Sequence, residues 1–203
     1  MKAETKPRPY RQVARARARQ RTRDALLDAA ETVFLRKGWE QGSVDASVEA
    51  LARSAGVTKQ TLLRHFGSKE ALLEEVVRRI GERVHDQRWA TPTDDVAGAV
   101  ENLLDHYKEW GEEVLRIGAA ERSPAIAEIA QQGRQLHYEW VEQAFGRWLD
   151  RLKGRARSSR RATLIALCDV HTWWLLSHDL NLSRREVQGT LTEAIERVLE
   201  DTR

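Results

Sequence analysis

The sequence predicts an all-α protein. From Thr22 to the C-terminus, apolar residues recur three or four positions apart in successive segments, which is the spacing of one helix face. The chain has 203 residues with only four prolines, it contains no Asn-Gly or Asp-Gly turn pair, and valine and isoleucine rarely alternate with polar residues, so strands are not expected. Its length suffices for a small domain of about 60 residues and a second helical core.

The first residues are strongly basic. Nine lysines and arginines and one glutamate precede Asp24, a charge of +8, whereas the whole chain carries +3, so the residues from Asp24 onward carry −5. Arginines at every second position from Arg15 to Arg23 suit an extended or partly ordered arm that follows phosphates or enters a minor groove. A disordered, solvated tail is the alternative. We therefore predict a flexible basic arm over residues 1–19, with the candidate DNA contacts Arg19, Arg21 and Arg23.

A first helix is predicted from Thr22 to Lys37. Its apolar stripe consists of Leu26, Leu27, Ala30, Val33 and Phe34. Gly38 lies just past its end, where glycine commonly terminates a helix.

Two short helices around a tight turn are predicted between Ser47 and Phe66. Ala52 leaves room where the two helices cross, and Gly56 can adopt the positive φ that the turn requires. Thr58 is placed to cap the second helix, since its hydroxyl can accept from an unpaired backbone N–H. An ordinary helical hairpin with one polar face is the alternative to a DNA-reading motif.

The second of these helices has two different faces. Leu62 and Phe66 lie four residues apart and point inward. The opposite face carries Lys59, Gln60, Leu63 and Arg64. In the major groove of DNA, cationic side chains read guanine and glutamine reads adenine. Residues 47–66 are therefore a candidate DNA-reading element.

A further helix follows directly and disfavours the simple hairpin. Ser68 is its candidate N-cap, Glu70 lies in its first turn, and its apolar run is Ala71, Leu72, Leu73, Val76 and Val77. Three helices and a fourth that leads away would make a compact domain.

Short motifs from Thr22 to Val77 follow one another in a distinctive order. Phe34, Lys37, Gly38 and Trp39 close the first helix, and the later motifs are Ala55 to Thr58, Thr61-Leu62, His65-Phe66 and Ser68 to Leu72. This stretch, about a quarter of the chain, resembles the N-terminal domain of TetR-type transcriptional regulators. The outward face and the resemblance together nominate these DNA contacts: Ser47, Thr58, Lys59, Gln60, Thr61, Leu63, Arg64, His65 and Lys69.

The resemblance implies a domain order and a function. It implies a three-helix helix-turn-helix DNA-binding domain over residues 20–82, followed by a helical ligand-sensing and dimerisation domain over residues 83–203. It also implies a homodimeric repressor that a small apolar or aromatic effector releases from a palindromic double-stranded operator. No cofactor and no metal are expected.

Two positions depart from the pattern of the family. Leu63 stands where the family usually has a tyrosine that contacts a phosphate, so one backbone contact is lost, although Leu63 could meet a thymine methyl. The connection between Gly38 and Ser47 is about four residues longer than usual. Ser43 and Ser47 are alternative caps of the second helix, and we favour Ser47.

Further helices are predicted to the end of the chain. Their approximate bounds are Lys69–Arg88, Thr93–Trp110, a short irregular helix before Ser123-Pro124, Pro124–Lys153, Ser159–His178 and Ser183–Asp201. Ser183 and Glu186 have the spacing of a capping box.

The last two predicted helices carry apolar stripes that need a cover. In proteins that this chain resembles, two such helices pair with their copies in a four-helix dimer interface. A core within one chain is the alternative. The candidate interface residues are Leu164, Leu167, Cys168, His171, Trp174, Leu175, His178, Val187, Leu191, Ile195 and Val198.

Large rings are frequent in the middle of the second domain. Such rings, with a few polar groups, could line a pocket for the effector, although most aromatic stripes are core. The candidate pocket residues are His106, Tyr107, Trp110, His137, Trp140, Val141 and Trp173. We expect the helix that begins at Lys69 to couple such a pocket to the DNA-reading helix.

Two other classes of function remain as alternatives. Cys168, Asp169 and His171 could suggest enzymatic chemistry, but no glycine-rich phosphate loop or nucleophile elbow accompanies them. An architectural DNA-binding protein that ignores small molecules is the second alternative. No segment approaches about twenty uncharged apolar residues, so we expect a soluble cytoplasmic protein without membrane contact. A single cysteine excludes an internal disulfide.

Overall fold

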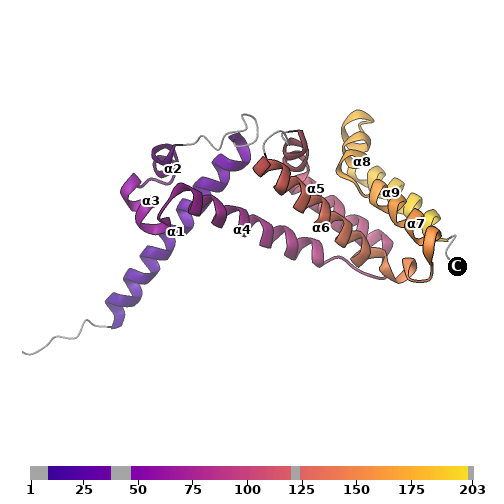
Figure 1. Ribbon diagram of the computed structural model, residues 1–203, viewed down its shortest axis with the longest axis horizontal. Coiled ribbons are helices and arrows are strands. Elements are labelled where there is room, and N and C mark those ends of the chain that lie inside the picture. The colour runs from indigo at the N-terminus through magenta and orange to yellow at the C-terminus, as the bar shows by residue number, and fades with distance from the viewer. Residues whose placement is uncertain (1–8, 38–46, 120–123, 201–203) are drawn as a thin grey trace, which may run out of the picture. The chain divides into compact units, whose positions relative to one another are not determined.

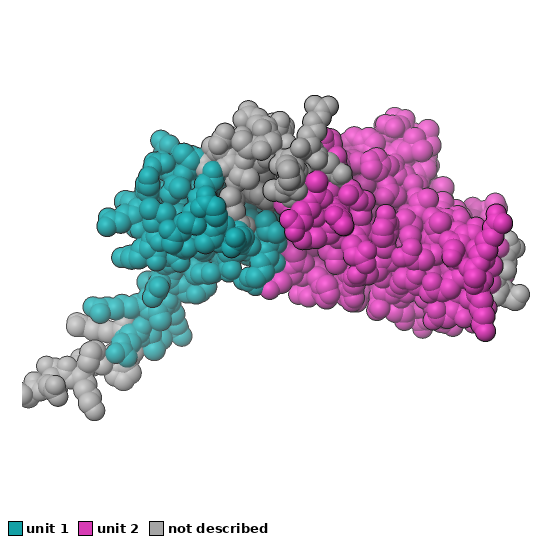
Figure 2. All heavy atoms as spheres, viewed as in Figure 1, with its two compact units in different colours: residues 1–80 teal, residues 81–203 magenta. Residues whose placement is uncertain are grey.

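The computed structural model describes residues 9–37, 47–119 and 124–200 (Figure 1). Every regular element within these ranges is a helix, which confirms the predicted all-α fold class. The chain divides into two compact units, residues 1–80 and residues 81–203, which are coloured separately in Figure 2. The helix α4 (Lys69–Trp89) contains the boundary between them.

The first helix is longer than predicted. Helix α1 runs from Pro9 to Lys37, so the expected extended or flexible arm is wrong over residues 9–19, which are helical. The reason is local, because alanine, arginine and glutamine favour helices and the segment simply extends a helix already fixed by packing further on. Successive second positions differ by about 200° around a helix. Arg15, Arg19 and Arg23 therefore lie on one side of α1, and Arg17 and Arg21 on the other.

The turn between the next two helices forms as predicted. Helix α2 (Val48–Ser54) is capped by Ser47, whose Oγ accepts from Ala50 N at 3.1 Å, which confirms Ser47 as the start. The alternative cap, Ser43, lies outside the described residues. Gly56 has φ +67°, as the turn requires. Helix α3 (Lys59–Phe66) is capped by Thr58, whose Oγ1 accepts from Thr61 N at 3.2 Å.

The core of the first unit fixes these helices. Leu26, Leu51 and Leu62, one from each of the first three helices, are all almost completely buried. Helix α4 adds Leu72 and Val76, and Ser68 caps it by accepting from Ala71 N at 3.1 Å. Leu62 is thus held from several sides, and it determines which face of α3 turns outward.

The second unit is a bundle of helices, several of which differ from the predicted ones. After the end of α4, its elements are α5 (Val96–Ala119), α6 (Pro124–Leu149), α7 (Gly154–Leu167), α8 (Val170–Trp174), the π-helical turn η1 (Leu175–Asp179) and α9 (Arg184–Glu200). The short irregular helix predicted before Ser123 is wrong over 111–119, because α5 continues there. Gly111 lies within α5, and the Trp173 ring packs directly against it. A Cβ at position 111 would overlap that ring, so glycine is required at this position. The predicted cap Ser123 lies outside the described residues.

The single helix predicted from Ser159 to His178 is interrupted. Helix α7 starts earlier, at Gly154, and ends at Leu167, and Asp169 caps α8 by accepting from His171 N at 2.9 Å. An aspartate that caps its own following turn competes with helix continuation, which the spacing of apolar residues does not reveal. The capping box before α9 is confirmed: Ser183 N donates to Glu186 Oε2 at 2.8 Å, and Glu186 N donates to Ser183 Oγ at 3.4 Å.

Much of the predicted dimer interface is core within one chain. Five of its residues, Leu164, Cys168, Val187, Leu191 and Ile195, are almost completely buried in a cluster shared with α5 and α6. The prediction is wrong for these five, because an apolar stripe records that a face is covered but not by which helix. Leu167, Trp174 and Val198 are half-buried. His171, Leu175 and His178 are exposed.

Candidate functional site

The outward face of α3 is the first candidate site. Lys59, Gln60 and Arg64 are exposed, and Leu63 is half-buried beside them. Thr58 and Thr61 share a hydrogen bond of 3.0 Å between their hydroxyls at the start of the helix. The cap and the buried Leu62 hold this face in one orientation, with cationic and amide groups of the kind that read base edges.

Lys59 has a partner that the sequence did not reveal. Its Nζ lies 2.7 Å from Glu49 Oε1 of α2, and both side chains are about half exposed (54% each). The hydrogen bond from Lys59 is the main cause of the lowered pKa of Glu49. Such an exposed pair is weak, so Lys59 can exchange Glu49 for a stronger acceptor. No sequence signal marks this contact, because the two residues lie on different helices.

Arg23 makes contacts inside the first unit that the sequence did not reveal. Its Nη2 donates to Glu75 Oε1 at 2.9 Å, and its guanidinium lies 5.0 Å from the centre of the Phe66 ring. Arg23 thus ties α1, α3 and α4 together, and its role as a DNA contact stays a prediction. An arginine on a helical stripe looks the same in sequence whether its partner is an acid or a phosphate.

Arg19 lies near the end of α3. Burial lowers the pKa of His65, and the charges of Arg19 and Arg64 lower it further. The lowered pKa favours the neutral imidazole, which can contact DNA through a hydrogen bond. Arg21 lies on the opposite side of α1, so the structure does not bring it together with Arg19.

The remaining two predicted DNA contacts lie at helix starts. Ser47 caps α2 with its hydroxyl, and Lys69 is the first residue of α4. Backbone N–H groups at helix starts favour anions, which suits contact with phosphates.

Glu75 connects two arginines and should make the first unit sensitive to acid. Arg78 donates to its carboxylate twice, at 2.7 and 3.1 Å, and Arg23 donates once. The bonds from Arg78 and then Arg23 lower the pKa of Glu75 from 4.5 to about 2. Because the pKa is lower in the folded state, this contribution to stability is present above pH 4.5 and is lost as the pH falls towards 2.

We expect Glu75→Gln to remove part of the acid sensitivity of the first unit. Stability, measured by urea unfolding at a series of pH values, should fall less steeply below about pH 4.5 in this variant than in the wild type. Glu74→Gln, at the exposed neighbouring position, is the matched control and should keep the wild-type slope. Equal slopes for all three proteins would show that the Glu75 contacts contribute nothing.

The seven candidate pocket residues lie within the bundle, and most of them are buried. Trp140 and Val141 are completely buried, His106, Tyr107 and Trp110 are nearly so, and His137 and Trp173 are half-buried. Tyr107 OH donates to the backbone oxygen of Cys168 at 2.7 Å. The structure therefore brings these rings together, but as neighbours within the bundle.

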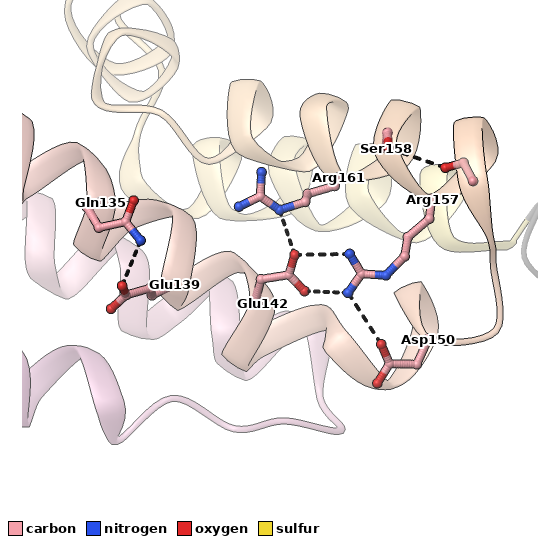
Figure 3. A network of polar contacts seen from close by, with 8 residues as sticks. Gln135, Glu139, Glu142, Asp150, Arg157, Ser158 and Arg161 are labelled. Atoms are coloured by element: carbon pink, nitrogen blue, oxygen red, sulfur yellow. Dashed lines mark hydrogen bonds and ion pairs between the residues drawn. The ribbon is translucent and has the colours of Figure 1, made fainter.

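A surface groove of about 560 Å³ lies elsewhere in the second unit. It is lined by Trp89, Gln135, Tyr138, Glu139, Glu142, Gln143 and Arg161, and none of the seven candidates is among them. Figure 3 shows the contacts along one wall. The Glu142 carboxylate of α6 accepts hydrogen bonds from Arg157 Nη1 and Nη2 at 3.3 and 2.8 Å, and from Arg161 Nε at 2.6 Å. Both arginines belong to α7. Burial acts to raise the pKa of Glu142, but the bonds from these arginines lower it overall. The groove is thus a polar, internally paired surface.

Arg88 is the buried charge that sequence reasoning missed. It is only 3% exposed, and its guanidinium lies 4.3 Å from the centre of the Trp140 ring. An arginine near the end of a helix is normally exposed to solvent, so nothing in the sequence indicated that Arg88 is buried.

The chain is similar to known regulatory proteins. Residues 26–76 match the family model described as bacterial regulatory proteins, tetR family. The chain is 28% identical over 102 residues to the HTH-type transcriptional regulator AlkX of Mycobacterium tuberculosis, covering 50% of this chain and 44% of AlkX. It is 27% identical over 131 residues to UidR of Escherichia coli, an HTH-type transcriptional regulator, covering 61% of this chain and 64% of UidR. The matches thus span about half to two thirds of these relatives.

Solved structures have the same fold. A transcriptional regulator from Rhodococcus sp. Rha1 superposes with a TM-score of 0.60 at 19% identity, over 88% of this chain and 96% of that one. A TetR-family regulator described as putative, from Rhodococcus sp., gives 0.51 at 20% identity, over 88% and 99% of the two chains. None of the described helices is long and apolar enough to cross a membrane.

Proposed function

Because the chain belongs to the tetR family of bacterial regulatory proteins, we propose that it is a homodimeric repressor that binds a palindromic operator and is released by a small-molecule effector. The exposed face of α3 carries this proposal. Lys59, Gln60 and Arg64 are presented on a helix whose start is capped and whose inner face is buried. A family of regulators is not a family of enzymes, and the enzyme hypothesis is set aside.

The chemistry at Cys168 agrees with this choice. The thiol is completely buried, and burial raises its pKa to about 12. A thiol that does not ionise near neutral pH is a poor nucleophile and a poor metal ligand. Cys168 is therefore a core residue.

We propose that dimerisation uses the exposed end of α8, η1 and the turn before α9. Leu175 and Leu180 are 48% and 57% exposed, and Trp174 and His178 stack at 3.7 Å beside them. Exposed apolar groups of this kind favour burial against a second copy. A two-fold dimer presents two reading helices to a palindrome. A monomer in light scattering at micromolar concentration would contradict this proposal.

Release by an effector requires a connection between the two units. Helix α4 supplies one, since it begins directly after α3 and ends inside the second unit. An effector can release the operator only if it binds one arrangement of the dimer better than the other. The structural relatives with a common fold support a second helical domain for this role but name no effector.

Selection of DNA sequences from a random pool tests the proposed function. A regulator should enrich one palindromic sequence and retain a preference for it as salt increases. An architectural DNA-binding protein should enrich no sequence, and its affinity should collapse with salt. A cytoplasmic location is part of the same proposal.

Lys69→Ala is expected to weaken binding to operator and random DNA alike. The loss of one phosphate contact should reduce the slope of log K against log salt by about 0.9. Lys108→Ala, at an exposed position of α5, is the matched control. A changed sequence preference with an unchanged slope would mean that Lys69 contacts a base instead.

A further inference from the structure

Arg88 is a buried cation without an acidic partner. Among the described residues, no carboxylate lies within ion-pair distance of its guanidinium. Its Nη2 approaches His137 Nδ1 at 3.2 Å, and the Trp140 ring covers one face of the group. A guanidinium offers five N–H donors, and burial of a charge without pairing is costly. The guanidinium also hydrogen-bonds Tyr107, so its partners in this part of the chain are neutral groups and its charge is not balanced by a described acid.

The neighbours of Arg88 are neutral. His137 Nε2 lies 3.1 Å from the backbone oxygen of Ile165, which can only accept, so Nε2 carries the proton and Nδ1 accepts from Arg88. Burial and then the charge of Arg88 lower the pKa of His137 to about 4. The same two causes lower the pKa of His106 well below its usual value. Neither imidazole adds charge at neutral pH, so the cluster carries one positive charge.

Asp169 does not serve as the counter-ion. Its charge acts to raise the pKa values of Tyr107 and His137, but its Oδ1 accepts from the backbone N and from Nδ1 of His171, at 2.9 and 2.7 Å. Two further buried nitrogens in the cluster have no partner: His106 Nδ1 and Trp140 Nε1. Both belong to side chains that are more than nine-tenths buried.

We propose that this cluster binds the effector and that the effector is a small aromatic monocarboxylate, whose carboxylate pairs with Arg88. Trp140 stacks on the face of the guanidinium, and the N–H donors lie at the edge of the group. Donors in this arrangement can form a bidentate hydrogen bond with a carboxylate. Trp140 Nε1 and His106 are further donors or acceptors for the ligand. A single positive charge favours a monoanion, because a phosphate dianion would leave a net negative charge buried. The proposal rests on the proposed function, since it names the ligand class of the regulated site.

The position of Arg88 gives such a ligand a route to the DNA-reading helix. Arg88 belongs to α4, nineteen residues after Lys69, or about 28 Å along one continuous helix. The surrounding rings of Tyr107, Trp140 and Trp173 come from α5, α6 and α8. A ligand seated between Arg88 and these rings would fix α4 relative to the bundle.

Binding of benzoate and benzamide to the full chain without DNA tests the proposal. The two probes share a ring and differ in charge, and melting temperature and titration calorimetry report their binding. We expect benzoate to stabilise the protein and benzamide to bind at least about tenfold more weakly. Arg88→Met should abolish the effect of benzoate and change the melting temperature of the free protein only modestly, because relief of the buried charge offsets the loss of the hydrogen bond to His137.

Arg83→Met is the matched control. Arg83 also lies on α4 and its guanidinium is 5.2 Å from the centre of the Trp110 ring, but its side chain is exposed. This variant should respond to benzoate as the wild type does. No benzoate binding, equal binding of benzamide, or full binding to Arg88→Met would overturn the proposal. A large loss of stability in Arg88→Met would instead assign Arg88 a purely structural role. None of these outcomes depends on DNA, so failure here is distinct from failure to select an operator.

Discussion

We expect the double variant Lys59→Ala/Gln60→Ala to lose its preference for a selected operator while it still binds DNA without preference. Both side chains are exposed on the outer face of α3, where they can reach base edges. Each such contact with a base is worth about 1–3 kcal/mol, so the loss of two contacts should lower the preference about 30-fold or more. Competition binding of the selected operator against random DNA at constant salt measures the ratio directly.

A matched variant separates base reading from loss of charge. Lys108→Ala/Gln132→Ala removes the same two side-chain types from exposed positions of α5 and α6, and it should keep the wild-type preference. If the Lys59 and Gln60 variant also keeps it, the outward face of α3 does not read the operator. Glu49→Gln adds a second check, because it frees Lys59 from its partner at 2.7 Å and should strengthen binding.

Leu62→Ala should destabilise the first unit by about 2–5 kcal/mol, the usual cost of such a core truncation. Leu62 is completely buried between the helices that orient α3. Whole domains are stable by only about 5–15 kcal/mol, so this loss should weaken binding to every DNA sequence. Amide hydrogen exchange in α2 and α3, together with urea unfolding, measures the loss.

Leu63→Ala is the control for this prediction, since it truncates the same side chain one position later. Leu63 is half-buried on the outer side, so its loss should change stability by only about 0.5 kcal/mol. Its effect should instead appear in sequence preference, if Leu63 meets a thymine methyl. Equal destabilisation by the two variants would mean that the two faces of α3 are not assigned correctly.

The helix-turn-helix motif could be predicted in detail because its determinants are local. Ser47, Gly56, Thr58 and Ser68 act through backbone groups within a few residues of themselves, so each is visible in sequence and each is confirmed. The all-α class and the capping box at Ser183 follow from the same short-range rules.

The errors arose where a residue has a choice of distant partners. The basic arm alternates arginine with good helix formers, and extension of α1 decided its conformation. Leu164 and Leu191 lie on stripes that either a second chain or the same chain could cover, and α5 and α6 cover them.

The helices around the turn, the exposed face of α3 and the resemblance to one family follow from the sequence alone, since caps, glycine conformation and helical periodicity act over a few residues. Three contacts become known only from the packed structure: Arg23 ties the first unit together, Lys59 meets Glu49, and Arg88 is buried against Trp140. These contacts join residues on different helices. Their formation depends on how whole helices pack, which no spacing along the chain records.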